Sequence, residues 1–415
     1  MPLFYLLFAV YVVAGCYLVT RISFIQRSGL TNQMIIGLFL IKIMAGMVLG
    51  WVSNYYSYNN DYWVLNRDGL VEYNLMLHEP HTFFTNIFHS PYDNAYGGFF
   101  NSVGSYWNDL KNNIILKLLA FCDIFSRGNY YINSLFFNFA GFFGHIALYR
   151  LFIHLYPGKK WLVIAGCFLL PSTLYFSSGI HKDLVVFTML GLYCYSLYFS
   201  IEQTFTRNRI LLLFLSAIAI LLTRNFLVVA LLPATAAYVI SSRRNLSAPA
   251  IFTGLYASGI LVLLVLQLAL PSFQPLKVIT QKQRDFLDLP AAASQLPVNI
   301  LEPSLQSFAE NLPQAINHSF FRPTVWEQAG KFSLLLAVEL LAYHTLLLLL
   351  LFRPEPNRLL NHPFVLFAIF FTLFMILVTG YIIPNSSSII RYKSIYLPML
   401  ITPVLCSIRW KKAAN

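Results

Sequence analysis

The stretch PFVLFAIFFTLFMILVTGYII, residues 363–383, contains no charged side chain. A helix needs about 20 apolar residues to cross the ~30 Å hydrocarbon core of a bilayer, so this stretch predicts a membrane-spanning helix. Other stretches of the chain share its apolar character. Together the predominantly apolar runs cover residues 3–20, 34–52, 132–149, 161–178, 184–200, 210–222, 226–240, 249–270, 332–352, 363–383 and 394–408.

The composition agrees with a chain that lies mostly in lipid. Of its 415 residues, 58% are hydrophobic and 11% are charged, whereas soluble domains carry about 25% charged residues. The sequence therefore predicts an all-α integral membrane protein, a single polytopic domain over residues 1–415 with about 11 transmembrane helices. The bilayer is its first expected partner.

The gaps between the apolar runs alternate in charge. One set of gaps holds fourteen basic and two acidic residues, the other holds thirteen of each sign, and Lys42 and Glu339 lie inside runs. Short cytoplasmic loops retain Lys and Arg, so the first set is assigned to the cytoplasm. Its basic residues are Arg21, Arg27, Arg150, Lys159, Lys160, Arg207, Arg209, Arg243, Arg244, Arg353, Arg358, Arg409, Lys411 and Lys412.

This assignment places the N-terminus outside and the C-terminus inside, in what we expect to be a bacterial cytoplasmic membrane. The net charge of +12 then reflects topology and attraction to anionic lipid headgroups rather than binding to nucleic acid. Two gaps on the outer face are long, residues 53–131 and 271–331, and we expect short interfacial helices within them. Around residues 210–240, two short runs flank Arg224, which favours a hairpin over one unbroken helix.

The five cysteines are scattered through the sequence, at positions 16, 122, 167, 194 and 406, without metal-type or paired spacing. Disulfides, a metal site and other cofactors are therefore not predicted, although a divalent cation is compatible with the chemistry considered below.

A polar turn between two apolar runs, residues 171–183, is the first candidate site. It ends in His181, Lys182 and Asp183. Lys182 is suited to hold a phosphate, and His181 or Asp183 to move a proton. The structural alternative is that Lys182 and Asp183 neutralise each other at a helix end.

Acidic residues in the first long gap form the second candidate. Asp61, Asp68, Glu72 and Glu79 recur at spacings that place them on one face if residues 60–78 are helical. Such a face would offer a general base, with Asp61 and Asp68 the preferred catalytic candidates because they lie nearest the membrane. A solvated helix face would show the same spacing.

Cations in apolar surroundings form the third candidate. Arg224, Arg322, Arg391 and Lys393 join Lys182 on the predicted outer side. Five positive groups at one level of the membrane would suit a diphosphate headgroup. Individually, each is equally suited to anchor its helix at the interface by extending to the headgroups.

The turn Ser-Gly-Ile-His-Lys-Asp before residue 184, the later Arg-Pro-Thr-Val-Trp-Glu and the segment from Asn385 to Lys393 resemble bacterial polytopic glycan-assembly enzymes. These are the C-type glycosyltransferases and the O-antigen polymerase-like proteins. The resemblance implies a polyprenyl-linked sugar donor, a glycan or protein acceptor and transfer on the outer face. It also implies a catalytic base at Asp61 or Asp68.

The same resemblance implies that Arg322 and Arg391 bind the lipid diphosphate. The chain departs from the C-type pattern because an extra helix precedes the long loop and no adjacent acidic pair stands in it. A transporter or flippase is the alternative, since Lys42 and Glu339 inside apolar runs would couple proton movement to a substrate if they paired. A noncatalytic assembly subunit is the third interpretation.

Overall fold

The computed structural model describes residues 2–56, 60–88, 106–243, 247–269, 274–290, 294–327, 331–356 and 359–410. Parts of both predicted outer insertions lie outside these residues. The same holds for four of the predicted cytoplasmic cations, Arg244, Arg358, Lys411 and Lys412.

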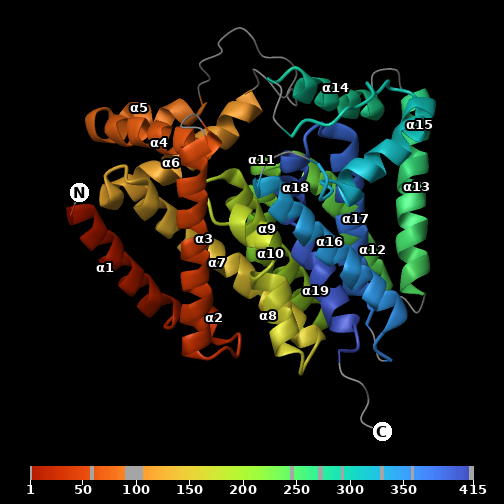
Figure 1. The fold of residues 1–415 in the computed structure, drawn as a ribbon, viewed down its shortest axis with the longest axis horizontal. Helices are drawn as coiled ribbons and strands as arrows, with labels where there is room; N and C mark the ends of the chain where they lie inside the picture. Colours follow the sequence, from red (N-terminus) through yellow and green to blue (C-terminus); the bar gives the residue numbers. More distant parts are fainter. Residues whose placement is uncertain are drawn as a thin grey trace. The chain divides into compact units, whose positions relative to one another are not determined.

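The described residues are predominantly helical, which confirms the all-α fold class (Figure 1). They also form a short 3-10 turn, η1, and a π-turn, η2. The helices up to the break at Arg224 are α1 Pro2–Val19, α2 Ser23–Gln26, α3 Asn32–Tyr56, α4 Asp61–His78, α5 Pro80–Thr85, η1 Asn86–Phe88, α6 Tyr106–Ser126, α7 Tyr130–Leu155, α8 Lys160–Phe168, α9 Pro171–Phe176, α10 Lys182–Glu202 and α11 Arg207–Thr223. Those that follow are α12 Asn225–Arg243, α13 Ala248–Ala269, α14 Pro275–Leu287, α15 Leu305–Ile316, η2 Asn317–Phe321, α16 Lys331–Phe352, α17 Pro363–Ile382, α18 Ser386–Ser394 and α19 Leu397–Ser407.

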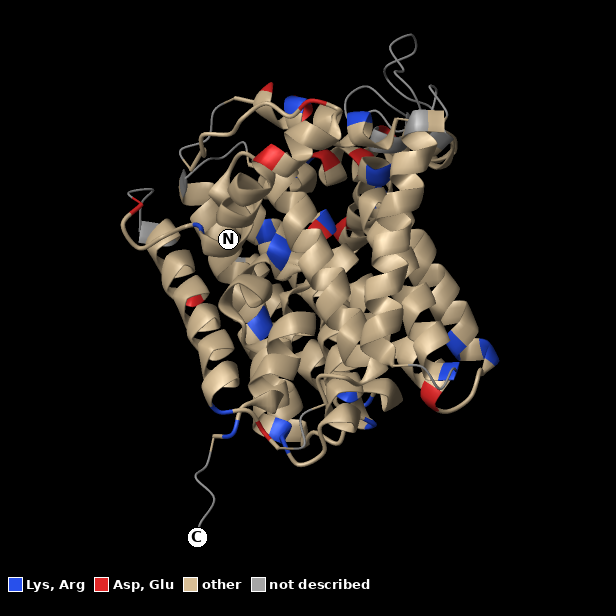
Figure 2. Ribbon diagram, turned by 90° about the vertical axis from the view of Figure 1, so that its right-hand side faces the viewer, with Lys and Arg blue, Asp and Glu red and all other residues tan. Residues whose placement is uncertain are grey.

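Seven of the described helices are long and apolar enough to cross a membrane: α3, α7, α10, α12, α13, α16 and α17. The pair α18 and α19 would make an eighth span if it crosses as one bent unit. Charged residues lie mostly near helix ends and in connecting segments (Figure 2). These features are those of a multi-pass membrane protein, whereas the count of about 11 and the orientation stay predictions.

Two predicted runs are broken in the structure. Residues 161–178 form α8 and α9, because Pro171 lacks the amide hydrogen that a continuing helix needs and restricts the residue before it. At the end of the chain, α18 and α19 meet at 70°. Apolar composition predicted the position of these segments but not their bends.

Two compact units make up the chain, one of Met1–Leu155 with Cys167–Asn225 and one of Tyr156–Gly166 with Phe226–Asn415. The single domain predicted for residues 1–415 stays a prediction.

In the first unit, α7 packs against α1, α3, α6 and α10, and α4 packs on α6. A buried apolar cluster joins α3, α4, α6, α7 and α10, and includes Leu49, Tyr62, Leu119, Phe137 and Leu184. This cluster fixes the N-terminal ends of α4 and α10 relative to each other. Those two ends carry the candidate site.

A buried polar network also fastens α4 to α6 and α7. Asn133 on α7 donates to Asp123 Oδ1 at 2.6 Å and to Asn66 Oδ1 at 2.9 Å. Asn66 in turn donates to the carbonyl of Gly128, in the turn between α6 and α7. Because buried polar groups are costly unless they are hydrogen-bonded, this network favours one register of α4.

In the second unit, α17 packs against α13, α14, α15, α18 and α19. Gln283 on α14 donates to the carbonyl of Tyr381 at the end of α17 at 3.0 Å. Large apolar side chains of α13, such as Leu261 and Val265, remain exposed. Exposed apolar side chains of this kind are expected where a helix faces lipid rather than water.

Candidate functional site

Two helix N-termini meet in the first unit, those of α4 and α10. Asn60 caps α4, since its side chain accepts from the backbone amides of Tyr62 and Trp63. This places Asp61 at the first helical position. His181 caps α10, and Asp183 follows in the first turn, where a negative charge is favoured by the helix dipole.

Buried side chains of α3 and α7 hydrogen-bond to the backbone that precedes His181. Lys42 on α3 donates to the carbonyl of Ser177 at 2.6 Å and lies 3.3 Å from the hydroxyl of Ser178. Asn138 on α7 donates to the Ser178 carbonyl at 2.8 Å. The turn between α9 and α10 is therefore fixed to two membrane-spanning helices.

Glycine permits this close approach. A Cβ atom at Gly46 on α3 would lie 2.6 Å from the Ser178 carbonyl oxygen, and one at Gly179 would lie 2.8 Å from Leu49 and Tyr62. These separations are too short for a side chain, so both positions need glycine for α3 and the turn to pack as they do.

Four ionisable side chains meet at the start of α10. Asp183, which is 1% exposed, forms a buried ion pair with Arg224 and lies 2.9 Å from Nδ1 of His181. Nε2 of His181 lies 3.7 Å from Oδ2 of Asp61, whose side chain is 62% exposed. The four groups form a series: the buried guanidinium of Arg224, the buried carboxylate of Asp183, the imidazole of His181 and the solvent-exposed carboxylate of Asp61.

The protonation of His181 decides what this arrangement does. The 2.9 Å contact between Nδ1 and Oδ2 of Asp183 is a close approach of the two side chains rather than a hydrogen bond, so it does not fix a proton on Nδ1. With the proton on Nε2, Nδ1 accepts from the backbone amide of Asp183, a contact of 3.2 Å. Arg224 pairs with Asp183, and Asp183 lies against the imidazole, so these two side chains fix the position of the ring.

Lys182 lies beside this cluster. Its ammonium donates to Asn112 Oδ1 on α6 at 2.8 Å, while Asp183 contacts Arg224 and His181 instead. The contacts thus differ from simple neutralisation between Lys182 and Asp183. A half-buried ammonium beside an imidazole is suited to anion binding.

The remaining acids of α4 differ in their surroundings. The segment is helical, as the predicted acidic face requires, but Glu72 forms an ion pair with Lys117 on α6 at 2.6 Å. Glu79 accepts from the hydroxyl of Thr82 at the start of α5. Asp68 stays exposed; desolvation by its surroundings raises its pKa, and neighbouring Arg67 opposes that rise.

The other three predicted cations belong to the second unit. Lys393 is buried and donates to the carbonyl of Ser319 in η2 at 2.6 Å. Arg322 ends η2 and pairs with Glu327 at 3.3 Å. Arg391 precedes Lys393 on α18. The structure therefore divides the five predicted cations between the two units: Lys182 and Arg224 belong to the first, and Arg322, Arg391 and Lys393 belong to the second.

His318 was not among the sequence-predicted residues. It is buried within η2, and its Nδ1 has no hydrogen-bond partner among the described residues. Burial lowers the pKa of His318, and nearby Arg322 lowers it further, while Glu327 opposes the shift. Elsewhere in the same unit, on α16, Glu339 accepts from the hydroxyl of Tyr343.

Lys42 and His145 were also missed as part of the site. The only sequence signal was a lysine inside an apolar run, which suggested a pair with Glu339. In the structure Nζ of Lys42 contacts the turn before His181 and lies 3.2 Å from Nε2 of His145. A buried ammonium needs several acceptors, and these lie 103 to 136 positions away in sequence.

Within the described ranges, no group of three or more His, Cys, Asp or Glu side chains is arranged to hold a metal ion. The five cysteines are free thiols.

Comparisons with protein-family models, with curated proteins and with solved structures give no significant match to this chain.

Proposed function

We propose that the protein is a membrane glycosyltransferase or glycan polymerase that uses a polyprenyl phosphate- or diphosphate-linked sugar donor. It acts on the outer face of a bacterial cytoplasmic membrane, in a chain of about 11 passes with the N-terminus outside and the C-terminus inside. The observation that carries the proposal is the position of His181 between buried Asp183 and exposed Asp61, with Lys182 adjacent. This is the geometry of an oriented general base next to an anion-binding group.

The reaction assigns each group a role. The acceptor hydroxyl loses its proton to Asp61 or His181 as its oxygen bonds to the anomeric carbon of the donor sugar. The bond from that carbon to the phosphate oxygen breaks, and the lipid phosphate leaves with the electron pair. Lys182 stabilises the charge that develops on the leaving group. Arg224 acts by holding Asp183 beside His181 rather than on the phosphate itself.

Asp68 and the second-unit cations have supporting roles in this proposal. Asp68 is a second candidate base because its pKa is raised toward the range in which a carboxylate both accepts and releases protons. Arg322, Arg391 and Lys393 are the further candidates for binding the diphosphate or the charged acceptor. A divalent cation is not required by any step.

The test is complementation of a deletion strain, with lipid-linked intermediates analysed by mass. We expect His181→Ala and Asp61→Asn to reduce glycan transfer by about 10²- to 10⁴-fold, the usual contribution of a general base. Glu79→Gln, an acid at the other end of the same helix, should restore transfer to the wild-type level. Immunoblots of the membranes control for expression.

Two outcomes would contradict the proposal. Transfer that survives neutralisation of Lys182, Arg322 and Arg391 together would remove the phosphate-binding role. Loss of substrate movement in Glu339→Gln with glycosyl transfer unaffected would instead favour a transporter.

A further inference from the structure

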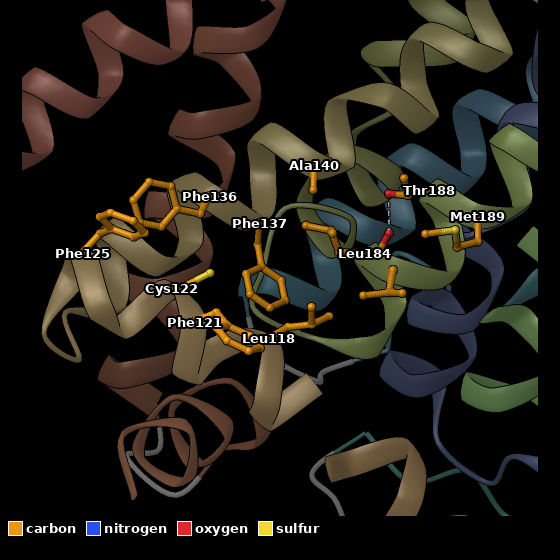
Figure 3. A pocket seen from close by; sticks show the side chains of 11 residues that line it. Leu118, Phe121, Cys122, Phe125, Phe136, Phe137, Ala140, Leu184, Thr188 and Met189 are labelled. Carbon is orange, nitrogen blue, oxygen red and sulfur yellow. Dashed lines mark hydrogen bonds between the residues drawn. The ribbon is translucent and has the colours of Figure 1, made fainter. Parts of the chain in front are cut away.

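An apolar groove lies next to the candidate site in the first unit. It has a volume of about 440 Å³ and is bounded by α6, α7 and α10 (Figure 3). Leu118 and Phe121 line it from α6, Phe137 and Ala140 from α7, and Val185 from α10. Leu118 and Phe121 are about half exposed, so the groove is open along α6.

The side chains that line the groove present mainly carbon atoms to it. Thr188 contributes a hydroxyl, but that hydroxyl donates to the carbonyl of Leu184 on its own helix at 2.7 Å (Figure 3). A cavity that is apolar and lacks polar partners does not hold ordered water well. Its volume lies within the range of ligand pockets, and its lining suits a hydrocarbon ligand.

Lys182 does not line this groove, but it lies on α10 three residues before Val185, which does. Lys182, Val185 and Met189 are spaced three and seven residues apart along α10, so they lie on one helix face. At 1.5 Å per residue, Val185 lies ~4.5 Å and Met189 ~10 Å along the helix from Lys182. The contact of Lys182 with Asn112 places the cation between α10 and α6, which are also two walls of the groove.

We propose that this groove binds the isoprenoid chain of the lipid-linked donor, with the donor phosphate bound at Lys182. The inference rests on the proposed function and adds the place where the lipid is held. Charge complementarity identifies the occupant as a phosphate lipid, because a cation lies about one helical turn before the lining residues of an otherwise apolar groove. A chain held along α10 also brings the sugar-phosphate bond beside His181, at the N-terminus of the same helix.

The experiment measures binding without requiring transfer. The full-length protein in phosphatidylcholine nanodiscs is titrated with a photoreactive long-chain polyprenyl phosphate, and cross-links are mapped by mass spectrometry. Ala140→Phe fills the groove, and Ala257→Phe makes the same change on an exposed face of α13. We expect Ala140→Phe to weaken binding by about 15- to 50-fold, since it displaces two or three methylene groups. Ala257→Phe should leave binding unchanged, and wild-type cross-links should map to α6, α7 and α10.

Binding of inorganic pyrophosphate tests the headgroup site separately from the site for the isoprenoid chain. Its binding should be unaffected by Ala140→Phe and weakened by Lys182→Met. Equal polyprenyl phosphate affinity in Ala140→Phe and wild type would overturn the inference, as would full displacement of the probe by phosphatidylglycerol. If the probe binds as expected but no donor supports transfer, the proposed function fails alone. If transfer proceeds with the same donor KM in Ala140→Phe, the groove assignment fails alone.

Discussion

Arg224 shows at the residue scale how one buried charge shapes the site. It lies between α11 and α12, and its side chain is 7% exposed. There it forms a buried ion pair with Asp183. A buried ion pair adds little net stability, because both charges must leave water, but removal of one partner leaves an uncompensated charge. The pair therefore makes each of the two buried side chains depend on the other for its contribution to stability.

The first prediction follows from this asymmetry. Arg224→Met should lower the free energy of unfolding by about 3–5 kcal/mol, since Asp183 is left buried without its cation. The double variant Arg224→Met/Asp183→Leu should regain most of that loss. Thermal unfolding in detergent measures both, with Arg207→Met as a control at an exposed arginine. A double variant that is less stable than either single variant would show that the two side chains are not coupled in this way.

Several site residues could be predicted from the chemistry of single residues in the sequence. Asp61, His181, Lys182 and Asp183 were selected because a charged group near a membrane is energetically costly unless it is paired or faces water. The structure brings the side chains of Asp61, His181 and Asp183 together at the start of α10, where Lys182 also lies. Their roles stay predictions. Lys42 was recognised as unusual, but its contact with Ser177 depends on how α3 packs against the turn before α10, which no local pattern encodes.

At the scale of elements, the turn between α9 and α10 depends on α3. Gly46 on α3 lies against the carbonyl of Ser178, while Gly37 on the same helix has open space around it. An added methyl group should therefore have opposite effects at the two positions.

We predict that Gly46→Ala destabilises the protein by about 1–3 kcal/mol through overpacking. Gly37→Ala should stabilise it by about 0.5–1 kcal/mol, because alanine favours helix. Glycan transfer should fall in Gly46→Ala, since the turn that presents His181 must shift, and stay unchanged in Gly37→Ala. Thermal unfolding and the complementation assay provide the two measurements. Equal behaviour of the variants would mean that the turn tolerates displacement of α3.

The elements themselves were largely predictable because hydropathy is a local property. Residues 363–383 were predicted as a span, and α17 runs from Pro363 to Ile382. The break at Arg224 was also expected, and α11 ends at Thr223. The division of residues 161–178 was not expected, although Pro171 marks the point where α9 begins.

For the whole molecule, the alternating charge of the gaps is the feature with the largest consequence. If the basic gaps face the cytoplasm, His181 and the acids of α4 face outside, where a lipid-linked donor meets its acceptor. The opposite orientation would place the same groups in the cytosol.

Cysteine labelling tests this orientation. In a background without the native cysteines, His81→Cys should react with a membrane-impermeant maleimide on spheroplasts, and Thr204→Cys should react only after permeabilisation. Both positions are exposed in the structure and lie outside the predicted spans. The reverse pattern would place the candidate site in the cytosol and remove the proposed reaction with it.

The sequence by itself determined that this protein is helical and lies in a membrane, because apolar run length and charge between runs act through solvation of each segment separately. It also indicated which ionisable groups merit attention. Only the tertiary structure decided their partners: Arg224 and His181 with Asp183, and Lys42 with the turn before His181. It alone also formed the apolar groove between α6, α7 and α10. These contacts depend on how each helix is rotated and packed against its neighbours, which hydropathy along the chain does not specify.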